Sequence, residues 1–195
     1  MRVAFSGKAG AGKTSLAEFL AADHGFIRYS FAGALKAELS RVLDLSIFEL
    51  TDIDKKQRWR SLMQEWGGAR RYIDESYWVL KIINSIKERK SGVNFVIDDL
   101  RYVNEANALQ AAGFVLVRLE CPSIDSIDYM QSLGASLRGA ADASKHESET
   151  DLDEYPHFDH IIEAPRSKPI TEIYNEVLDV LSISILAKNK NKSPV

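Results

Sequence analysis

The sequence contains very little cysteine and no long apolar run. Cys121 is its only cysteine, so an internal disulfide is excluded and a reducing compartment is favoured. No stretch is apolar over the length that a bilayer requires, and Met1 leads directly into a short apolar segment. We therefore expect a cytoplasmic protein without a signal peptide and without a membrane partner.

The sequence also has little net charge. Its 25 basic and 28 acidic residues give a formal net charge of −3. Such a balance provides no general attraction for a polyanion, so a nucleic-acid partner is not expected. An anionic substrate would have to be bound by locally placed Lys and Arg side chains. A chain of 195 residues, 45% of them hydrophobic, fits one soluble domain with a substantial core.

Near the amino terminus, the phosphate-binding pattern G-x-x-x-x-G-K-[ST] is matched by Gly7-Lys8-Ala9-Gly10-Ala11-Gly12-Lys13-Thr14. Residues 2–5 before it indicate a buried strand, and residues 14–22 after it indicate a helix. The glycines allow backbone N–H groups to face phosphate oxygens, and the helix N-terminus adds partial positive charge. Lys13 is expected to reach the β- and γ-phosphates and Thr14 to bind Mg²⁺. A glycine-rich turn without a ligand is the alternative, which this spacing disfavours.

Strand and helix patterns alternate along the chain, which predicts an α/β fold with a parallel sheet. Five strands are predicted, at residues 2–5, 26–30, 93–97, 114–119 and 158–162. The single domain spans residues 1–195, with a core at 1–32, 91–130 and 156–187, a mostly helical arm at about 33–90, and a polar lid without clear periodicity at about 131–155. The arm is far longer than a crossover needs, so we expect it to bind a substrate.

Two acids and an arginine follow the predicted third strand. Asp98 and Asp99 stand where a P-loop protein places the acid that holds Mg²⁺ or orients the attacking oxygen, and Arg101 has the planar fork that suits a phosphate. The alternative is that these acids cap the following helix. The sequence favours a functional role for one of them without choosing which.

Five stretches carry a further signal. They are Asp99-Leu100-Arg101-Tyr102-Val103-Asn104-Glu105-Ala106; Ser30-Phe31-Ala32-Gly33-Ala34-Leu35-Lys36; Met63-Gln64-Glu65-Trp66-Gly67-Gly68 with Arg70-Arg71 and Tyr77-Trp78-Val79; His146-Glu147-Ser148-Glu149; and Phe158-Asp159-His160-Ile161-Ile162. Together with the P-loop they resemble the motifs of phage-type deoxynucleoside monophosphate kinases, which are related to adenylate and thymidylate kinases. The resemblance covers nearly the whole chain.

The resemblance implies a three-layer P-loop kinase fold with a five-stranded parallel sheet, a helical arm that binds the nucleoside monophosphate (NMP), and a short lid. It implies that ATP and Mg²⁺ are used to phosphorylate a deoxynucleoside monophosphate, in the host cytoplasm if a phage encodes the protein, and it allows a homodimer. The expected catalytic residues are Lys13, Asp98, Asp99, Arg101 and Arg138. The expected ATP-binding residues are Gly7, Ala9, Gly10, Ala11, Gly12, Lys13, Thr14, Ser15 and Ala164, with Thr14 and Asp99 at the metal. The expected substrate-binding residues are Phe31, Ala32, Lys36, Gln64, Trp66, Arg70, Arg71, Trp78, Arg101, His146 and Glu149.

The chain departs from these motifs mainly at the acceptor site. Gly33-Ala34 replaces Asp-Pro, Val103 replaces Pro, and either Arg70 or Arg71 fits the phosphate ligand. Trp66 also fits the apolar stripe of a helix, so a core position is an alternative for it. Two other functions stay open: a P-loop kinase with a hydroxyl acceptor, such as a 5-hydroxymethylpyrimidine in DNA or a coenzyme A precursor, and a non-catalytic nucleotide switch.

Overall fold

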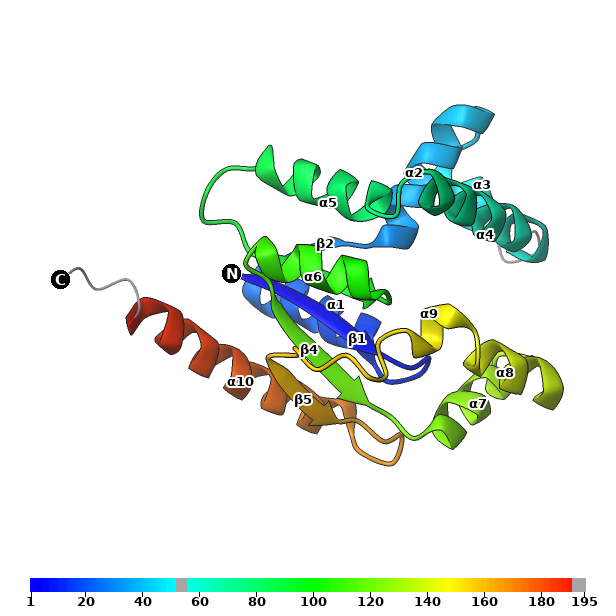
Figure 1. Ribbon diagram of the computed structural model, residues 1–195. Helices are drawn as coiled ribbons and strands as arrows, with labels where there is room; N and C mark the ends of the chain where they lie inside the picture. Colours follow the sequence, from blue (N-terminus) through cyan, green and yellow to red (C-terminus); the bar gives the residue numbers. More distant parts are fainter. Residues whose placement is uncertain (52–55, 191–195) are drawn as a thin grey trace. The chain divides into compact units, whose positions relative to one another are not determined.

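The structure is a computed structural model that describes residues 1–51 and 56–190. The chain divides into two compact units, unit 1 with residues 1–28 and 92–195 and unit 2 with residues 29–91. The elements are β1 (Arg2–Gly7), α1 (Lys13–His24), β2 (Ile27–Tyr29), α2 (Phe31–Leu43), α3 (Ile47–Thr51), α4 (Lys56–Ile73), α5 (Tyr77–Lys87), β3 (Phe95–Leu100), α6 (Val103–Ala111), β4 (Val115–Glu120), α7 (Ser123–Ser132), α8 (Leu137–Ser144), α9 (Glu147–Thr150), β5 (His160–Glu163) and α10 (Ile170–Lys190) (Figure 1).

A five-stranded parallel sheet in the order β2-β3-β1-β4-β5 forms the centre of unit 1. Alternate residues of its strands face opposite sides. On one side, Val3 and Phe5 of β1 pack in a cluster with apolar residues of α1 and α10. On the other side lies α6, whose Ala106 and Leu109 are fully buried (Figure 1). The predicted three-layer α/β class is therefore confirmed. The P-loop follows the carboxyl end of β1, at the edge of the sheet where the other parallel strands also end.

The third strand runs three residues further than the sequence pattern indicated. β3 ends at Leu100, so Asp98 and Asp99 lie within the strand and not after it. An apolar run marks only the part of a strand that is covered on both faces, so it stops short where polar side chains are accommodated. Asp98 is accommodated because it accepts a hydrogen bond from Arg28 on β2.

The lid is helical, which corrects the expectation of an irregular loop at 131–155. It contains the end of α7 together with α8 and α9. Side-chain caps begin two of these helices: the Ser136 hydroxyl accepts from the Gly139 N–H at 3.1 Å, and the His146 ring accepts from the Ser148 N–H at 3.2 Å. Short polar helices of this kind bury no apolar stripe, so hydrophobic periodicity does not reveal them.

Unit 2 consists of α2 to α5 and contains the whole of the predicted arm, 33–90. Its buried apolar residues include Leu39, Trp78, Val79 and Ile82. The last two helices of this unit, α4 and α5, end at Ile73 and Lys87.

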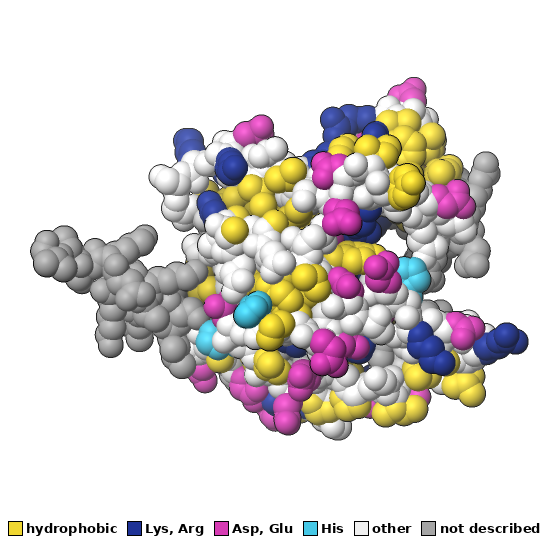
Figure 2. Space-filling view, in the orientation of Figure 1, with side chains coloured by type: hydrophobic (Ala, Val, Ile, Leu, Met, Phe, Trp, Pro, Cys, Tyr) yellow, Lys and Arg dark blue, Asp and Glu magenta, His cyan; other side chains and the backbone are white. Residues whose placement is uncertain are grey.

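Charges of both signs are interspersed on the face drawn in Figure 2, in keeping with the small net charge. Exposed apolar side chains gather on α2 and α3 of unit 2, where Phe48 is 80% exposed. None of the described helices combines the length and the apolar character needed to cross a membrane.

Candidate phosphate-binding site

The loop between β1 and α1 has the backbone that its glycines permit. Gly7, Gly10 and Gly12 all have positive φ, at 147°, 84° and 87°. A Cβ at Gly7 would lie 2.5 Å from the carbonyl oxygen of Leu119 on β4, so this position has no room for a side chain. A Cβ at Gly10 would lie 2.8 Å from the ring of Tyr129. Glycine at positions 7 and 10 thus allows the loop to pack closely against Leu119 and Tyr129.

Lys13 lies beneath this loop and is 8% exposed. Its ammonium donates to the carbonyl oxygens of Gly7 and Lys8 at 2.6 and 2.8 Å. The pKa of Lys13 is lowered to about 8, mainly by burial and then by the nearby charge of Arg101, while the charge of Glu149 acts in the opposite direction. A bound phosphate would bring a negative charge beside this ammonium and would raise the pKa of Lys13.

The two acids of β3 are separated in their surroundings. Asp98 is 6% exposed and pairs with Arg28 at 2.8 Å. The charge of Asp99, in contrast, acts on Lys13 and raises the pKa of that lysine. Thr14 is exposed at the first turn of α1. Asp99 and Thr14 therefore both belong to the neighbourhood of Lys13, whereas Asp98 is engaged in an ion pair with β2.

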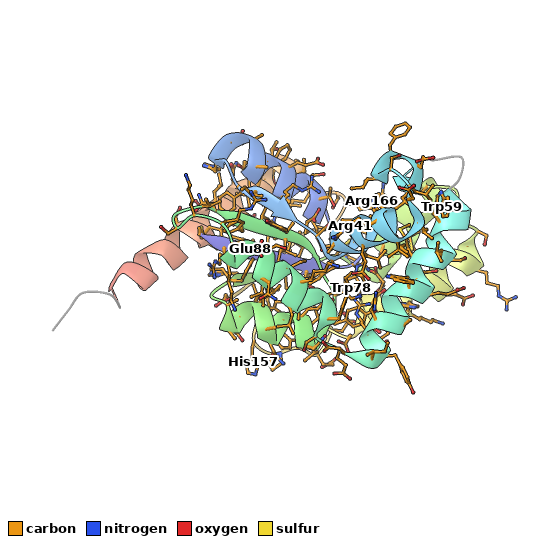
Figure 3. All side chains as sticks on the ribbon, turned by 90° about the horizontal axis from the view of Figure 1, so that it is seen from above. Arg41, Trp59, Trp78, Glu88, His157 and Arg166 are labelled. Atoms are coloured by element: carbon orange, nitrogen blue, oxygen red, sulfur yellow. The ribbon has the colours of Figure 1, made fainter. Side chains whose placement is uncertain are left out.

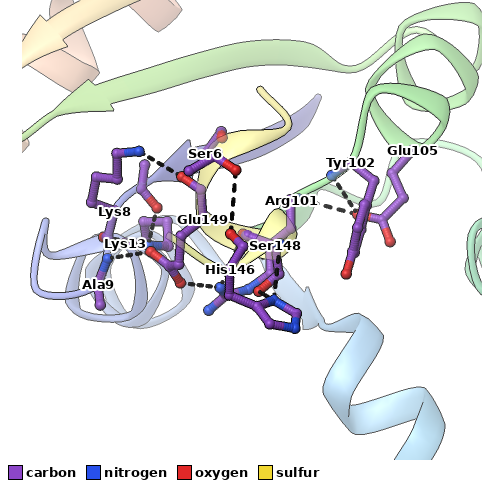
Figure 4. A network of polar contacts seen from close by, with 12 residues as sticks. Ser6, Lys8, Ala9, Lys13, Arg101, Tyr102, Glu105, His146, Ser148 and Glu149 are labelled. Carbon is purple, nitrogen blue, oxygen red and sulfur yellow. Dashed lines mark hydrogen bonds and ion pairs between the residues drawn. The ribbon is translucent and has the colours of Figure 1, made fainter. Parts of the chain in front are cut away.

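Arg101 and Glu149 meet at the P-loop (Figure 4). The carboxylate of Glu149 on α9 accepts the Ala9 N–H at 3.0 Å and an ion-paired hydrogen bond from Arg101. Arg101 also donates to the Ser148 carbonyl at 3.3 Å. The Glu149 side chain is 9% exposed, so this charge is nearly covered. An anionic group of the protein itself thus accepts from a loop amide and an arginine.

Sequence reasoning missed three charged residues of this site. Lys8 donates to the Glu149 carbonyl at 2.6 Å and pairs with Asp153. Arg118 on β4 donates to Asp153 at 2.6 Å and to the Ser6 hydroxyl at 3.0 Å. Arg118 could have been recognised from the sequence, because an arginine within an otherwise apolar buried strand needs a polar partner.

The remaining expected residues of unit 1 have varied surroundings. His146 caps α9 and shares a hydrogen bond with Ser148 (Figure 4). Arg138 on α8 is 94% exposed, with Asp142 3.9 Å away. Ala164 is buried directly after β5, and Ser15 lies in the first turn of α1. The structure therefore brings Lys13, Arg101 and Glu149 together and leaves Arg138 pointing to solvent.

Eight of the eleven expected substrate-binding residues belong to unit 2, where a second polar cluster surrounds Glu38. Trp66 and Arg70 donate to its carboxylate at 3.0 and 2.9 Å, and Tyr77 and Lys81 also donate to it. Burial raises the pKa of Glu38, but the hydrogen bonds from Lys81, Tyr77 and Trp66 outweigh it and lower the pKa to about 2. The sequence analysis did not identify Glu38. Its position on the same helical stripe as the apolar residues Leu35 and Leu39 is the feature that could have indicated a buried acid.

Two aromatic residues of unit 2 that are expected to bind the substrate are buried. Trp78 is 2% exposed and donates to the Gly67 carbonyl at 3.2 Å, so its ring is a core group (Figure 3). Phe31 is 6% exposed and is also buried. Trp66 is half-buried and lies 4.9 Å from the Arg70 guanidinium. The other expected residues of this unit are Ala32, Lys36, Gln64 and Arg71, of which Ala32 and Gln64 are exposed.

No family model matches the chain. A protein of Acanthamoeba polyphaga mimivirus described as "Putative deoxynucleotide monophosphate kinase" is 24% identical over 198 residues, which cover 90% of this chain and 93% of that protein. Among solved structures, a gluconokinase from Sinorhizobium meliloti 1021 has a TM-score of 0.60 at 14% identity, covering 98% of this chain and 97% of the other. The Thermus thermophilus protein TT1252 has a TM-score of 0.59 at 14% identity, covering 96% and 97%.

Sequence and structure thus agree on the architecture: the glycine-rich loop follows the first strand of a parallel sheet, and the fold is similar to that of a solved gluconokinase. The protein has the fold of the P-loop kinases, and its sequence resembles the deoxynucleotide monophosphate kinases.

Proposed function

We propose that the protein transfers the γ-phosphoryl group of ATP to a deoxynucleoside monophosphate. One observation carries the proposal: four cationic side chains, those of Lys8, Lys13, Arg101 and Arg118, gather at the P-loop of a protein with net negative charge. The name of the mimivirus relative supports the choice of acceptor.

Phosphoryl transfer between two phosphates brings two polyanions together, so catalysis depends on positioning and on neutralising charge. Lys13 would hold the β- and γ-phosphates from the P-loop side, and Arg101 would face the transferred group. The attacking phosphate oxygen is already anionic, so no general base is needed.

The residues near Lys13 fit Mg²⁺. This ion prefers oxygen ligands and keeps several waters, so one hydroxyl and one carboxylate from the protein are sufficient. Thr14 is exposed beside the loop, and Asp99 lies close enough to act on the charge of Lys13. When bound, the ion would neutralise phosphate charge, and Asp99 is the acid proposed as its ligand because its charge acts on Lys13.

Unit 2 would supply the acceptor site. Lys36, Arg70 and Arg71 remain the proposed phosphate ligands, and the half-buried Trp66 is the aromatic residue proposed to stack on the base. Arg138, 94% exposed on the lid, has the freedom to approach the transferred phosphate.

The test is to incubate purified protein with ATP, Mg²⁺ and a panel of natural and modified deoxynucleoside monophosphates. The formation of each deoxynucleoside diphosphate is then measured. We expect at least one to be phosphorylated. Lys13→Ala should lower the rate by about a hundredfold or more, since removal of one preorganised charge contact typically costs that much. ATP consumption that yields ADP and a phosphorylated hydroxyl acceptor, but no deoxynucleoside diphosphate, would replace this proposal with the alternative, in which Asp98 or Asp99 serves as the base.

A further inference from the structure

Glu149 accepts hydrogen bonds from groups that a P-loop protein normally directs at phosphate. Its carboxylate accepts from the Ala9 amide of the loop at 3.0 Å and is ion-paired with Arg101 (Figure 4). Its charge also raises the pKa of Lys13 and so favours the protonated form of that lysine. A loop amide, an arginine and the P-loop lysine are the groups that bind phosphate oxygens.

The segment that carries Glu149 is anchored independently of this carboxylate. Asp151 accepts from the Val103 amide at 2.7 Å, and Asp153 pairs with Lys8 and with Arg118. Lys8 also donates to the Glu149 carbonyl at 2.6 Å. The Glu149 side chain can therefore rotate away from the loop while these other contacts keep the segment in place.

Resting on the proposed use of ATP, we propose that Glu149 is an internal substitute for phosphate. Without nucleotide, its carboxylate occupies the position beside Ala9 and Arg101 and keeps the arginine directed at the loop. A triphosphate that enters the loop displaces it, because two anions cannot share those donors. Glu149 thus weakens nucleotide affinity while it preserves the geometry of the site.

The matched experiment compares Glu149→Gln with Glu147→Gln. Both changes remove one negative charge from α9, but Glu147 is exposed, and none of the described residues donates a hydrogen bond to its side chain. Calorimetric titration with ATP, and with inorganic tripolyphosphate as a probe without a nucleoside, should show about tenfold tighter binding to Glu149→Gln, the size expected when a charge-assisted hydrogen bond no longer competes. Glu147→Gln should change both affinities by less than twofold.

Weaker or unchanged binding of tripolyphosphate to Glu149→Gln would overturn the inference, as would equal tightening in Glu147→Gln. Thermal unfolding of both variants establishes that they are folded, and Glu149→Ala provides a second test at the same position with the same expected direction. No acceptor is present in these titrations. A failure to phosphorylate any monophosphate would therefore contradict the proposed function without affecting this result.

Discussion

Each unit contains a carboxylate that gathers cations, and the two carboxylates differ in what else they contact. Glu38 of unit 2 accepts from four side chains on two neighbouring helices, and its pKa is lowered to about 2. Glu149 of unit 1 accepts from a backbone amide of the P-loop and from one arginine. A ligand anion can take the place of Glu149, whereas the donors around Glu38 are fixed by helix packing. In this proposal Glu149 is exchangeable, whereas Glu38 is structural.

The largest effect expected from this comparison is loss of stability when Glu38 is removed. Glu38→Ala leaves Arg70 and Lys81 without their shared partner in a partly buried cluster, which should lower the free energy of unfolding by about 3–5 kcal/mol. Urea unfolding measures this value. Glu65→Ala, at an exposed position on α4, is the control and should change it by less than about 0.5 kcal/mol. An equal effect of both substitutions would show that Glu38 is no more structural than a surface acid.

The same residue predicts an acid limit of stability. The pKa of Glu38 is lowered in the folded protein from 4.5 to about 2, so the unfolded state binds more protons between these values. The stabilisation from Glu38 is complete above about pH 4.5 and is lost as the pH falls towards 2. Urea titrations at pH 5 and pH 3 should show a smaller decrease for Glu38→Gln than for the unchanged protein. Parallel decreases would place the acid sensitivity elsewhere.

These clusters also show how far the sequence could predict the molecule. The P-loop, β1 and α1 could be predicted because eight consecutive residues and two short apolar patterns specify them. The order of the strands and the lid helices α8 and α9 were not, since strand order depends on crossovers and the lid helices bury no apolar stripe. The Glu38 cluster joins residues 28 to 43 positions apart in the sequence, so only the packing of the helices reveals it. The roles of the P-loop residues remain predictions.

A third test asks whether the burial of a carboxylate sets how much its ion pair contributes to stability. Arg28 in unit 1 pairs with Asp98, which is 6% exposed, and with Glu18, which is 59% exposed. Asp98→Asn should cost about 1–3 kcal/mol of unfolding free energy because a buried charged hydrogen bond is lost. Glu18→Gln, on the same arginine, should cost less than about 0.5 kcal/mol because water screens the exposed pair. Equal costs from the two substitutions would show that burial does not set the contribution of these two ion pairs.

The smallest expected effect concerns the protonation of Lys13. The pKa of Lys13 is lowered to about 8, whereas a phosphate beside its ammonium would raise the pKa, so ATP binding above pH 8 must take up a proton. ATP affinity should then fall by up to about tenfold for each pH unit above 8. Calorimetry at pH 9 in two buffers of different ionisation enthalpy measures the uptake directly. Lys13→Arg keeps the charge over this range and should remove the uptake, because arginine does not titrate there. If proton uptake persists in that variant, a group other than Lys13 takes up the proton when ATP binds.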